Sequence, residues 1–212
     1  MTNKKSIAVI WDLDGTLIDS YPSIVSALFQ LYGEMGTPLA KEAIYHEIIT
    51  TNAGALIARM EKETGILFSD WAARYSQIRD GKTDQILGME HAEEALRSLQ
   101  NKGIAHYIFT HRGHSTFAIL DRLGLRSFFQ DIITKENGFP RKPSPEAIRY
   151  LIDKYQLDPA TTYYVGDRVL DMDCAFNAGI QGVMFIPPQS IAAPSGKESF
   201  LIHDLLDLEK IL

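Results

Sequence analysis

Residues 7–16 read Ile-Ala-Val-Ile-Trp-Asp-Leu-Asp-Gly-Thr. The first five are apolar and include β-branched side chains, which is typical of a short strand buried on both faces. Two carboxylates, Asp12 and Asp14, follow at once, and Gly15 lets the backbone turn tightly there. Ligands of open α/β sheets bind outside the carboxyl ends of strands, so this stretch predicts a parallel sheet with polar groups at one edge.

Four later segments have the same apolar or β-branched character and are expected to be strands. They lie at residues 105–110, 131–134, 162–165 and 182–186. Helical patterns separate them, because apolar residues recur with i, i+3, i+4, i+7 spacing in 92–99 and again in 148–155. Strands that alternate with helices predict an α/β fold with a parallel, Rossmann-like sheet core.

One region interrupts this alternation. Residues 19–83 carry helical stripes, such as Ile24, Ala27, Leu28 and Leu31, and contain no clear strand pattern. We therefore predict an all-helical cap domain at 19–83, inserted into a catalytic core made of 1–18 and 84–212. An insert that leaves the sheet directly after the first strand would cover the ligand site as a lid.

Composition limits the possible partners and locations. The chain has 212 residues, of which 45% are hydrophobic, and a formal net charge of -6. A disordered chain would lack such apolar content, and without a basic field neither nucleic acid nor an anionic membrane is expected as a main partner. The single cysteine, Cys174, favours a reducing, cytoplasmic location. We expect a monomer or weak homodimer that acts on a small molecule.

Residues of complementary chemistry follow the predicted strands or precede a later helix: Asp12, Asp14, Thr110, Lys142, Asp167 and Asp171. Clustered carboxylates repel one another and require a cation, and an all-oxygen donor set selects a hard ion such as Mg²⁺. A hydroxyl and an ammonium suit a phosphate group. A carboxylate can attack phosphorus, and its neighbour two residues on can move the proton. The set predicts phosphoryl transfer.

These residues resemble, in order and spacing, the four motifs of the haloacid dehalogenase-like superfamily. The resemblance extends from Ile7 to about Ile186, and Asp12 to Thr16 is its most specific part. It implies that Asp12 is the nucleophile and that Asp14 is the general acid/base. It also implies that Mg²⁺ is held by the side chain of Asp12, the backbone carbonyl of Asp14 and the side chain of Asp167.

The remaining motif residues are assigned in the same way. The resemblance implies that Thr110 and Lys142 bind the transferring phosphoryl group, and that Asp171 supports the metal's waters or orients Lys142. The position of the helical insert is similar to that of the α-helical cap in the phosphoglycolate phosphatase-like subgroup. Dehalogenases lack the second aspartate, so Asp14 favours a phosphatase or a mutase.

The expected function is a Mg²⁺-dependent phosphatase that hydrolyses a small phosphorylated metabolite, such as phosphoglycolate or a sugar phosphate, through an aspartyl phosphate. Two alternatives stay open. A phosphomutase of the same superfamily would interconvert sugar phosphate isomers. A phospho-accepting signalling receiver also combines acidic residues, a Thr and a Lys, although the helical insert and the pair Asp167 and Asp171 oppose it.

Other residues near the motifs have two interpretations each. His111 and Arg112 follow Thr110 and either contact the substrate or belong to a flexible polar loop. Residues 50–52, Thr-Thr-Asn, break the helical pattern and are a candidate substrate-facing loop of the insert. Cys174 is expected to be a small buried apolar residue.

Overall fold

The computed structural model describes residues 6–212, so residues 1–5 of the predicted core lie outside the described part. Its main feature is a six-stranded sheet with the order β5-β4-β1-β6-β7-β8. Every pairing in this sheet is parallel. The strands are β1 (Ala8–Trp11), β4 (Ala105–Phe109), β5 (Phe129–Ile133), β6 (Thr162–Gly166), β7 (Gln181–Phe185) and β8 (Phe200–Ile202).

The predicted α/β fold with a parallel sheet is confirmed, and each of the five predicted strands is present with small shifts at its ends. The edge strand β8 was missed. It has three residues, and two of them, Phe200 and Leu201, are exposed. A strand that short shows neither an apolar run nor an alternation, and the segment before it is rich in turn-forming residues.

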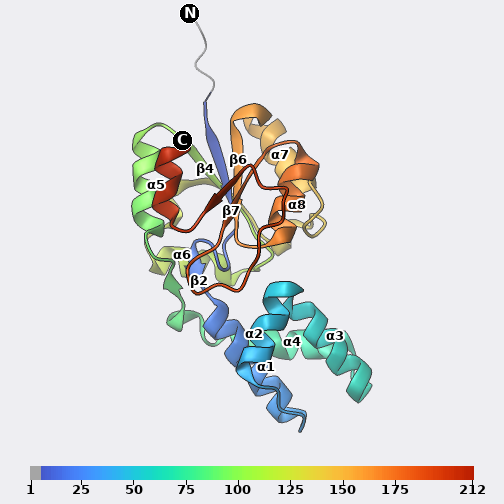
Figure 1. Cartoon of the computed structure of the whole chain (residues 1–212). Helices are drawn as coiled ribbons and strands as arrows, with labels where there is room; N and C mark the ends of the chain where they lie inside the picture. The colour runs from blue at the N-terminus through green and yellow to red at the C-terminus, as the bar shows by residue number, and fades with distance from the viewer. Residues whose placement is uncertain (1–5) are drawn as a thin grey trace, which may run out of the picture. The chain divides into compact units, whose positions relative to one another are not determined.

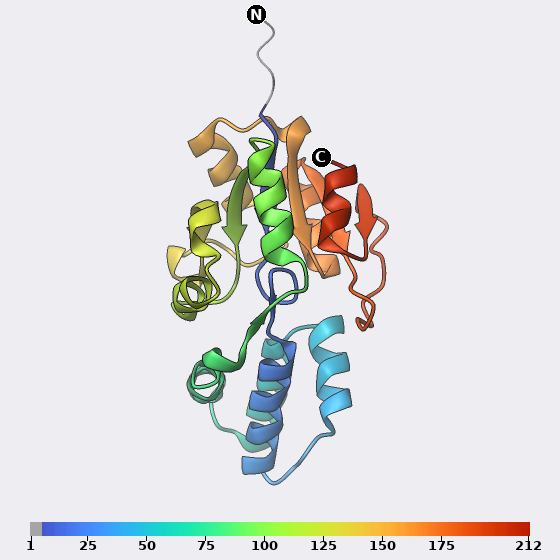
Figure 2. The same ribbon diagram turned by 90° about the vertical axis from the view of Figure 1, so that its left-hand side faces the viewer.

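Helices cover both faces of the sheet (Figures 1 and 2). Helix α5 (Ala92–Asn101) and the C-terminal 3₁₀ segment η5 (Leu205–Lys210) lie on one face, while α7 (Glu146–Tyr155) and α8 (Val169–Ala178) lie on the other. The core unit also contains α6 (Ser115–Arg122). Within residues 6–212, no helix has both the length and the apolarity that crossing a bilayer requires.

The sheet is held by apolar side chains on both of its faces. Strand β1 is completely buried, which explains its unbroken apolar sequence. On the face of the sheet that α7 covers, one apolar cluster combines Ile10, Tyr107 and Tyr164 with Ile148 and Leu151 of α7. These contacts keep the carboxyl ends of the central strands in a fixed arrangement.

The chain divides into two compact units, one of Met1–Asp19 with Gly88–Leu212 and one of Ser20–Leu87. Sequence patterning predicts the two boundaries at 18/19 and 83/84. The second unit, called the helical insert below, contains α1 (Tyr21–Glu34), α2 (Lys41–Thr50), α3 (Ala53–Thr64), α4 (Phe68–Asp80) and the 3₁₀ turn η1 (Thr83–Gln85). Two short strands, β2 (Ile18–Asp19) and β3 (Leu87–Gly88), pair with each other where the chain passes between the units.

The helical insert has its own core. The stripe predicted from Ile24, Ala27, Leu28 and Leu31 is the buried face of α1. The hydroxyl of the buried Tyr32 donates to the carbonyl oxygen of Leu56 at 3.1 Å and so ties α1 to α3. The insert is therefore stabilised by apolar packing within itself.

Candidate active site

Three neighbouring strands end side by side at one edge of the sheet. In the register of the central strands, Trp11 of β1 lies opposite Ile108 of β4 and Val165 of β6. The next residue, Asp12, donates its backbone N–H to the carbonyl oxygen of Val165 at 2.8 Å. Polar residues that follow these strands are thus brought together by the sheet itself.

Three of the predicted carboxylates form one cluster. Each of Asp12, Asp167 and Asp171 contributes an oxygen, and these oxygens all lie within 4.8 Å of one another. All three residues are at most 3% exposed. Thr16 donates its hydroxyl to Asp167 at 3.4 Å, a long hydrogen bond. Buried carboxylates so close together need a cation to balance them.

Lys142 supplies part of that positive charge. Its Nζ donates to Asp12 Oδ1 at 2.6 Å and to Asp171 Oδ1 at 2.8 Å. The same ammonium lies over the rings of Phe109 and Tyr164, 5.3 and 5.2 Å from their centroids. The aromatic faces and the two carboxylates together stabilise a lysine whose side chain is 1% exposed.

The electrostatics of this cluster favour a further cation. Burial raises the pKa of Asp12 to about 6, against the opposing effect of Lys142, and the charge of Asp171 adds to the rise. Burial opposes the charge of Lys142, yet Asp12 and Asp171 raise its pKa above the ordinary value. Lys142 is thus hydrogen-bonded to two of the three clustered carboxylates. A hard divalent ion fits this all-carboxylate donor set and would favour the ionised form of Asp12.

The turn after β1 brings the side chain of Asp14 to a different partner from those of the three clustered carboxylates. The carbonyl oxygen of Leu13 accepts the N–H groups of Thr16, Leu17 and Ile18, and Gly15 adopts a φ of 84° that favours glycine. The side chain of Asp14 is bound by the guanidinium of Arg112 in an ion pair of 2.5 Å. The carboxylate of Asp14 therefore lies outside the cluster formed by the other three.

The predicted phosphate-binding hydroxyl is buried at the end of β4. Thr110 is 1% exposed, and its Oγ1 accepts the backbone N–H of Arg112 at 3.0 Å. A hydroxyl that accepts one hydrogen bond still has its own proton to donate. Thr110 also follows Phe109, whose ring contacts the ammonium of Lys142.

His111 fixes the backbone of the lysine. Its Nε2 accepts the N–H of Lys142 at 2.9 Å, so the ring proton is on Nδ1. Burial, followed by the nearby charges of Lys142 and two arginines, lowers the pKa of His111 to about 2. The imidazole is consequently neutral and is hydrogen-bonded to the backbone of Lys142.

Sequence reasoning does not assign a role to two supporting residues. For Arg112 it allows substrate contact or a flexible loop, and in the structure this residue is 1% exposed and paired with Asp14. Tyr164 was interpreted only as part of a strand, but its hydroxyl donates to the Phe109 carbonyl at 3.1 Å and burial raises its pKa well above the ordinary value. The only available signal was that both residues flank motif positions.

Gly166, the last residue of β6, is required for steric reasons. A Cβ on Gly166 would lie 2.5 Å from the Cβ of Asp171. Asp171 in turn accepts the backbone N–H of Arg168 at 3.1 Å, at the start of α8. Because the end of β6 lies so close to the start of α8, Asp171 is held where it accepts a hydrogen bond from Lys142.

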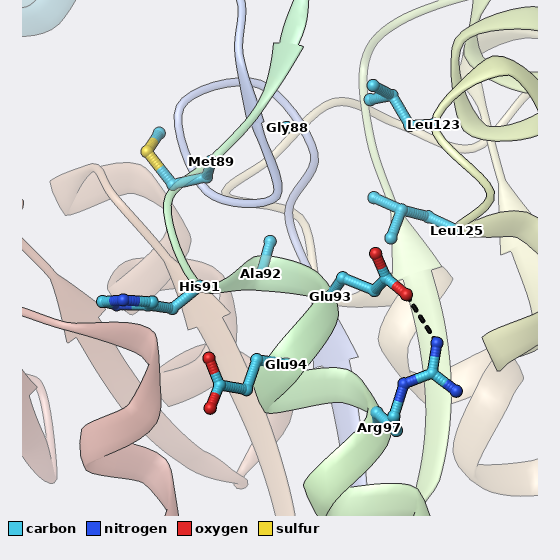
Figure 3. A pocket seen from close by; sticks show the side chains of 9 residues that line it. All are labelled: Gly88, Met89, His91, Ala92, Glu93, Glu94, Arg97, Leu123 and Leu125. Carbon is cyan, nitrogen blue, oxygen red and sulfur yellow. Dashed lines mark hydrogen bonds and ion pairs between the residues drawn. The ribbon is translucent and has the colours of Figure 1, made fainter.

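Two other features lie apart from this chemistry. A pocket of about 510 Å³ is lined by residues of 88–97 together with Leu123 and Leu125, and none of them belongs to the predicted site (Figure 3). Inside it, Glu93 and Arg97 pair with each other. Cys174 is buried as predicted, and burial raises the pKa of its thiol to about 12, so it is no nucleophile.

Comparison with known proteins identifies the family of the chain. The family model described as "Haloacid dehalogenase-like hydrolase" matches residues 9–185. A phosphoglycolate phosphatase from Vibrio cholerae is 30% identical over 82% of each chain, and a pyrophosphatase PpaX from Oceanobacillus iheyensis is 26% identical over 96% of this chain and 95% of its own. The hydrolase YfnB from Bacillus subtilis, solved with bound magnesium, superposes with a TM-score of 0.73 at 23% identity over 99% of both chains. The chain belongs to the haloacid dehalogenase-like hydrolase family.

Proposed function

We propose that the protein is a Mg²⁺-dependent phosphatase that hydrolyses a small phosphate monoester through an aspartyl phosphate. The observation that carries this proposal is the buried cluster of Asp12, Asp167 and Asp171 with Lys142 bridging Asp12 and Asp171. Such a cluster combines a nucleophilic carboxylate, a place for a hard cation and a positive charge for the phosphoryl oxygens.

Each predicted residue has a role in the first half of the reaction. An oxygen of Asp12 attacks phosphorus while the bond from phosphorus to the leaving oxygen breaks, and Asp14 gives that oxygen its proton. Lys142 and the hydroxyl of Thr110 stabilise the negative charge on the phosphoryl oxygens. The side chains of Asp12 and Asp167 and the backbone carbonyl of Asp14 would hold Mg²⁺, which would offset the charge of the phosphoryl group.

The second half restores the enzyme. Asp14 takes a proton from water as the water oxygen bonds to phosphorus, and the bond between phosphorus and Asp12 breaks. Asp171 keeps Lys142 in place through its 2.8 Å contact. Inorganic phosphate, the free carboxylate of Asp12 and protonated Asp14 remain, which is the state in which the cycle began, so atoms and charge balance.

The substrate class is inferred from the relatives. The matched proteins are named for phosphoglycolate and pyrophosphate, both small molecules. We assign a small phosphorylated metabolite to this chain and assign the choice among leaving groups to the helical insert, which begins four residues after Thr16. The lone Cys174 is consistent with a cytoplasmic location.

Phosphate release tests this proposal. The purified protein is incubated with phosphoglycolate, pyrophosphate, several sugar phosphates and p-nitrophenyl phosphate, with Mg²⁺ or with excess chelator. We expect release only with Mg²⁺, and none from the Asp12→Asn variant, whose amide cannot attack phosphorus although it has a similar shape. Isomerised sugar phosphate without phosphate release would identify a mutase instead. No turnover of any ester would overturn the proposal.

A further inference from the structure

Arg112, in the loop between β4 and α6, places a buried positive charge beside the proposed site. Its Nη2 donates to Asp14 Oδ1 at 2.5 Å, and its Nε donates to Oδ1 at 3.0 Å and to Oδ2 at 3.2 Å. The side chain of Arg112 is 0% exposed, and that of Asp14 is 24% exposed. We propose that Arg112 is a positioning residue that orients the Asp14 carboxylate for proton transfer. This inference rests on the function proposed above.

The loop that carries the guanidinium is itself held to the sheet. The backbone N–H of Arg112 donates to Thr110 Oγ1 at 3.0 Å, and its carbonyl accepts the N–H of Lys135, just beyond β5, at 3.1 Å. Its Nη1 also reaches the hydroxyl of Ser115, at 3.5 Å. Because the guanidinium of Arg112 is planar and its loop is held in place, it restricts the rotation of the Asp14 carboxylate.

The pairing suits proton transfer because a guanidinium only donates hydrogen bonds and keeps its protons in proteins. Arg112 therefore cannot take the proton that Asp14 carries. The side chain of Asp14 is 24% exposed, so a substrate oxygen or water can approach it. Its proton is exchanged with the leaving oxygen in the first half-reaction and with water in the second.

A purely structural role explains this arrangement less well. A buried guanidinium is costly, and replacing both members of a buried ion pair by apolar residues of similar volume is often neutral for stability, so stability alone does not call for this pair. Here the fork ends on the residue that must be oriented within a narrow range for proton transfer. An Arg112→Met variant tests the distinction, because methionine fills similar space and removes every donor.

The experiment measures kcat/KM for a series of phosphate monoesters, from aryl esters with acidic leaving groups to alkyl esters with basic ones. This ratio reports the steps up to formation of the aspartyl phosphate, where proton donation matters most for alkyl esters. We expect Arg112→Met to lower kcat/KM about 10- to 100-fold for alkyl esters and much less for p-nitrophenyl phosphate. The surface variant Arg126→Met, which removes an exposed pair with Asp121, is the matched control and should behave as wild type.

Two further variants show whether Arg112 acts through Asp14. In the Asp14→Asn background, adding Arg112→Met should cause no additional loss, since the group that it orients is already absent. Guanidinium added to Arg112→Ala should recover part of the alkyl ester activity. Equal losses for all esters, or additive losses in the double variant, would overturn the role of Arg112 alone. A wild-type protein without phosphatase activity would overturn the proposed function and this role together.

Discussion

At the scale of single residues, Asp12 has conflicting requirements. In the proposed reaction it attacks phosphorus as an ionised carboxylate, yet burial raises its pKa to about 6. Lys142 opposes that rise through its 2.6 Å contact, and a bound cation would oppose it further. Loss of Lys142 would therefore leave Asp12 buried beside Asp171 without the ammonium that opposes the rise in its pKa.

His106 gives a prediction about acid stability. Burial lowers its pKa from 6.5 to about 4, and its Nδ1 accepts the indole N–H of Trp11 at 3.1 Å. A histidine that folds in its neutral form contributes stability that is complete above pH 6.5 and is lost as the pH falls toward 4. Between pH 7 and pH 5 its contribution should decrease by about 2 kcal/mol.

Urea unfolding at these two pH values measures the effect. The His106→Asn variant keeps an acceptor for Trp11 but does not titrate, so its free energy of unfolding should fall by about 2 kcal/mol less than that of wild type. His114→Asn removes an imidazole that is 86% exposed and serves as the control. The same pH response in wild type and His106→Asn would show that His106 does not titrate as its burial requires.

The individual residues also show how far sequence reasoning reaches. Asp12, Asp167 and Lys142 could be identified because strand ends and motif spacing specify them, and the structure brings them together. The pairing of Arg112 with Asp14 joins residues 98 positions apart. Such a contact depends on loop conformations and side-chain directions that no periodic pattern encodes.

At the scale of elements, the contact between β6 and α8 determines the position of Asp171. Gly166→Ala would place a Cβ 2.5 Å from the Cβ of Asp171. We expect a loss of about 1–3 kcal/mol in stability, together with a strong decrease in phosphate release because Asp171 would move from Lys142. Chemical denaturation and a phosphate assay measure the two effects.

Gly33→Ala is the matched control for this variant. Gly33 lies in α1, and among the described residues no heavy atom lies within 4 Å of the position of its added Cβ, apart from its chain neighbours and the adjacent backbone of the same helix. The substitution should therefore raise stability by about 0.4–1 kcal/mol, since alanine restricts the unfolded chain and suits a helix. If Gly166→Ala matched wild type in stability and activity, the close packing of Gly166 against Asp171 would not position the carboxylate.

Elements differ in how well their sequences predict them. The buried strand β1 is apolar throughout and was recognised directly, whereas the two-residue strands β2 and β3 have no periodicity. Within the insert, residues 50–52 were interpreted as a substrate-facing loop. The structure shows that Asn52 caps α3 by accepting the N–H of Ala55, while the hydroxyls of Thr50 and Thr51 bond back to α2.

At the scale of the whole molecule, cation binding should be separable from folding. The apolar core holds the sheet without the carboxylate cluster, so a chelator should abolish phosphate release while the protein stays folded. Free Mg²⁺ at ten times its dissociation constant should add about 1.4 kcal/mol to stability. Thermal unfolding with Mg²⁺ and with chelator measures this difference.

Asp167→Asn is the control for the cation prediction, because it removes a proposed ligand and keeps the hydrogen bonds of Lys142 to Asp12 and Asp171. The Mg²⁺-dependent increase in stability should disappear in this variant. Ca²⁺ takes more oxygen ligands at longer distances, so it should bind and leave phosphate release low. Unfolding in chelator, or an unchanged Mg²⁺ effect in Asp167→Asn, would contradict the assignment of the cluster.

We expect the two compact units to control different kinetic properties: the core unit controls turnover of every ester, and the helical insert controls KM and substrate preference. Every residue assigned to the phosphoryl group belongs to the core unit, which therefore carries the charge of the transition state. Lys142→Ala should depress turnover of all esters alike. Thr50→Ala and Thr51→Ala, both in the insert, should change KM and the ranking of substrates while turnover of p-nitrophenyl phosphate is kept. Asn52 is left intact because its loss would weaken α3 by about 1 kcal/mol. The kinetic constants of all three variants on several phosphate esters measure both effects. Equal losses on every ester in the threonine variants would refute a role of these residues in substrate preference.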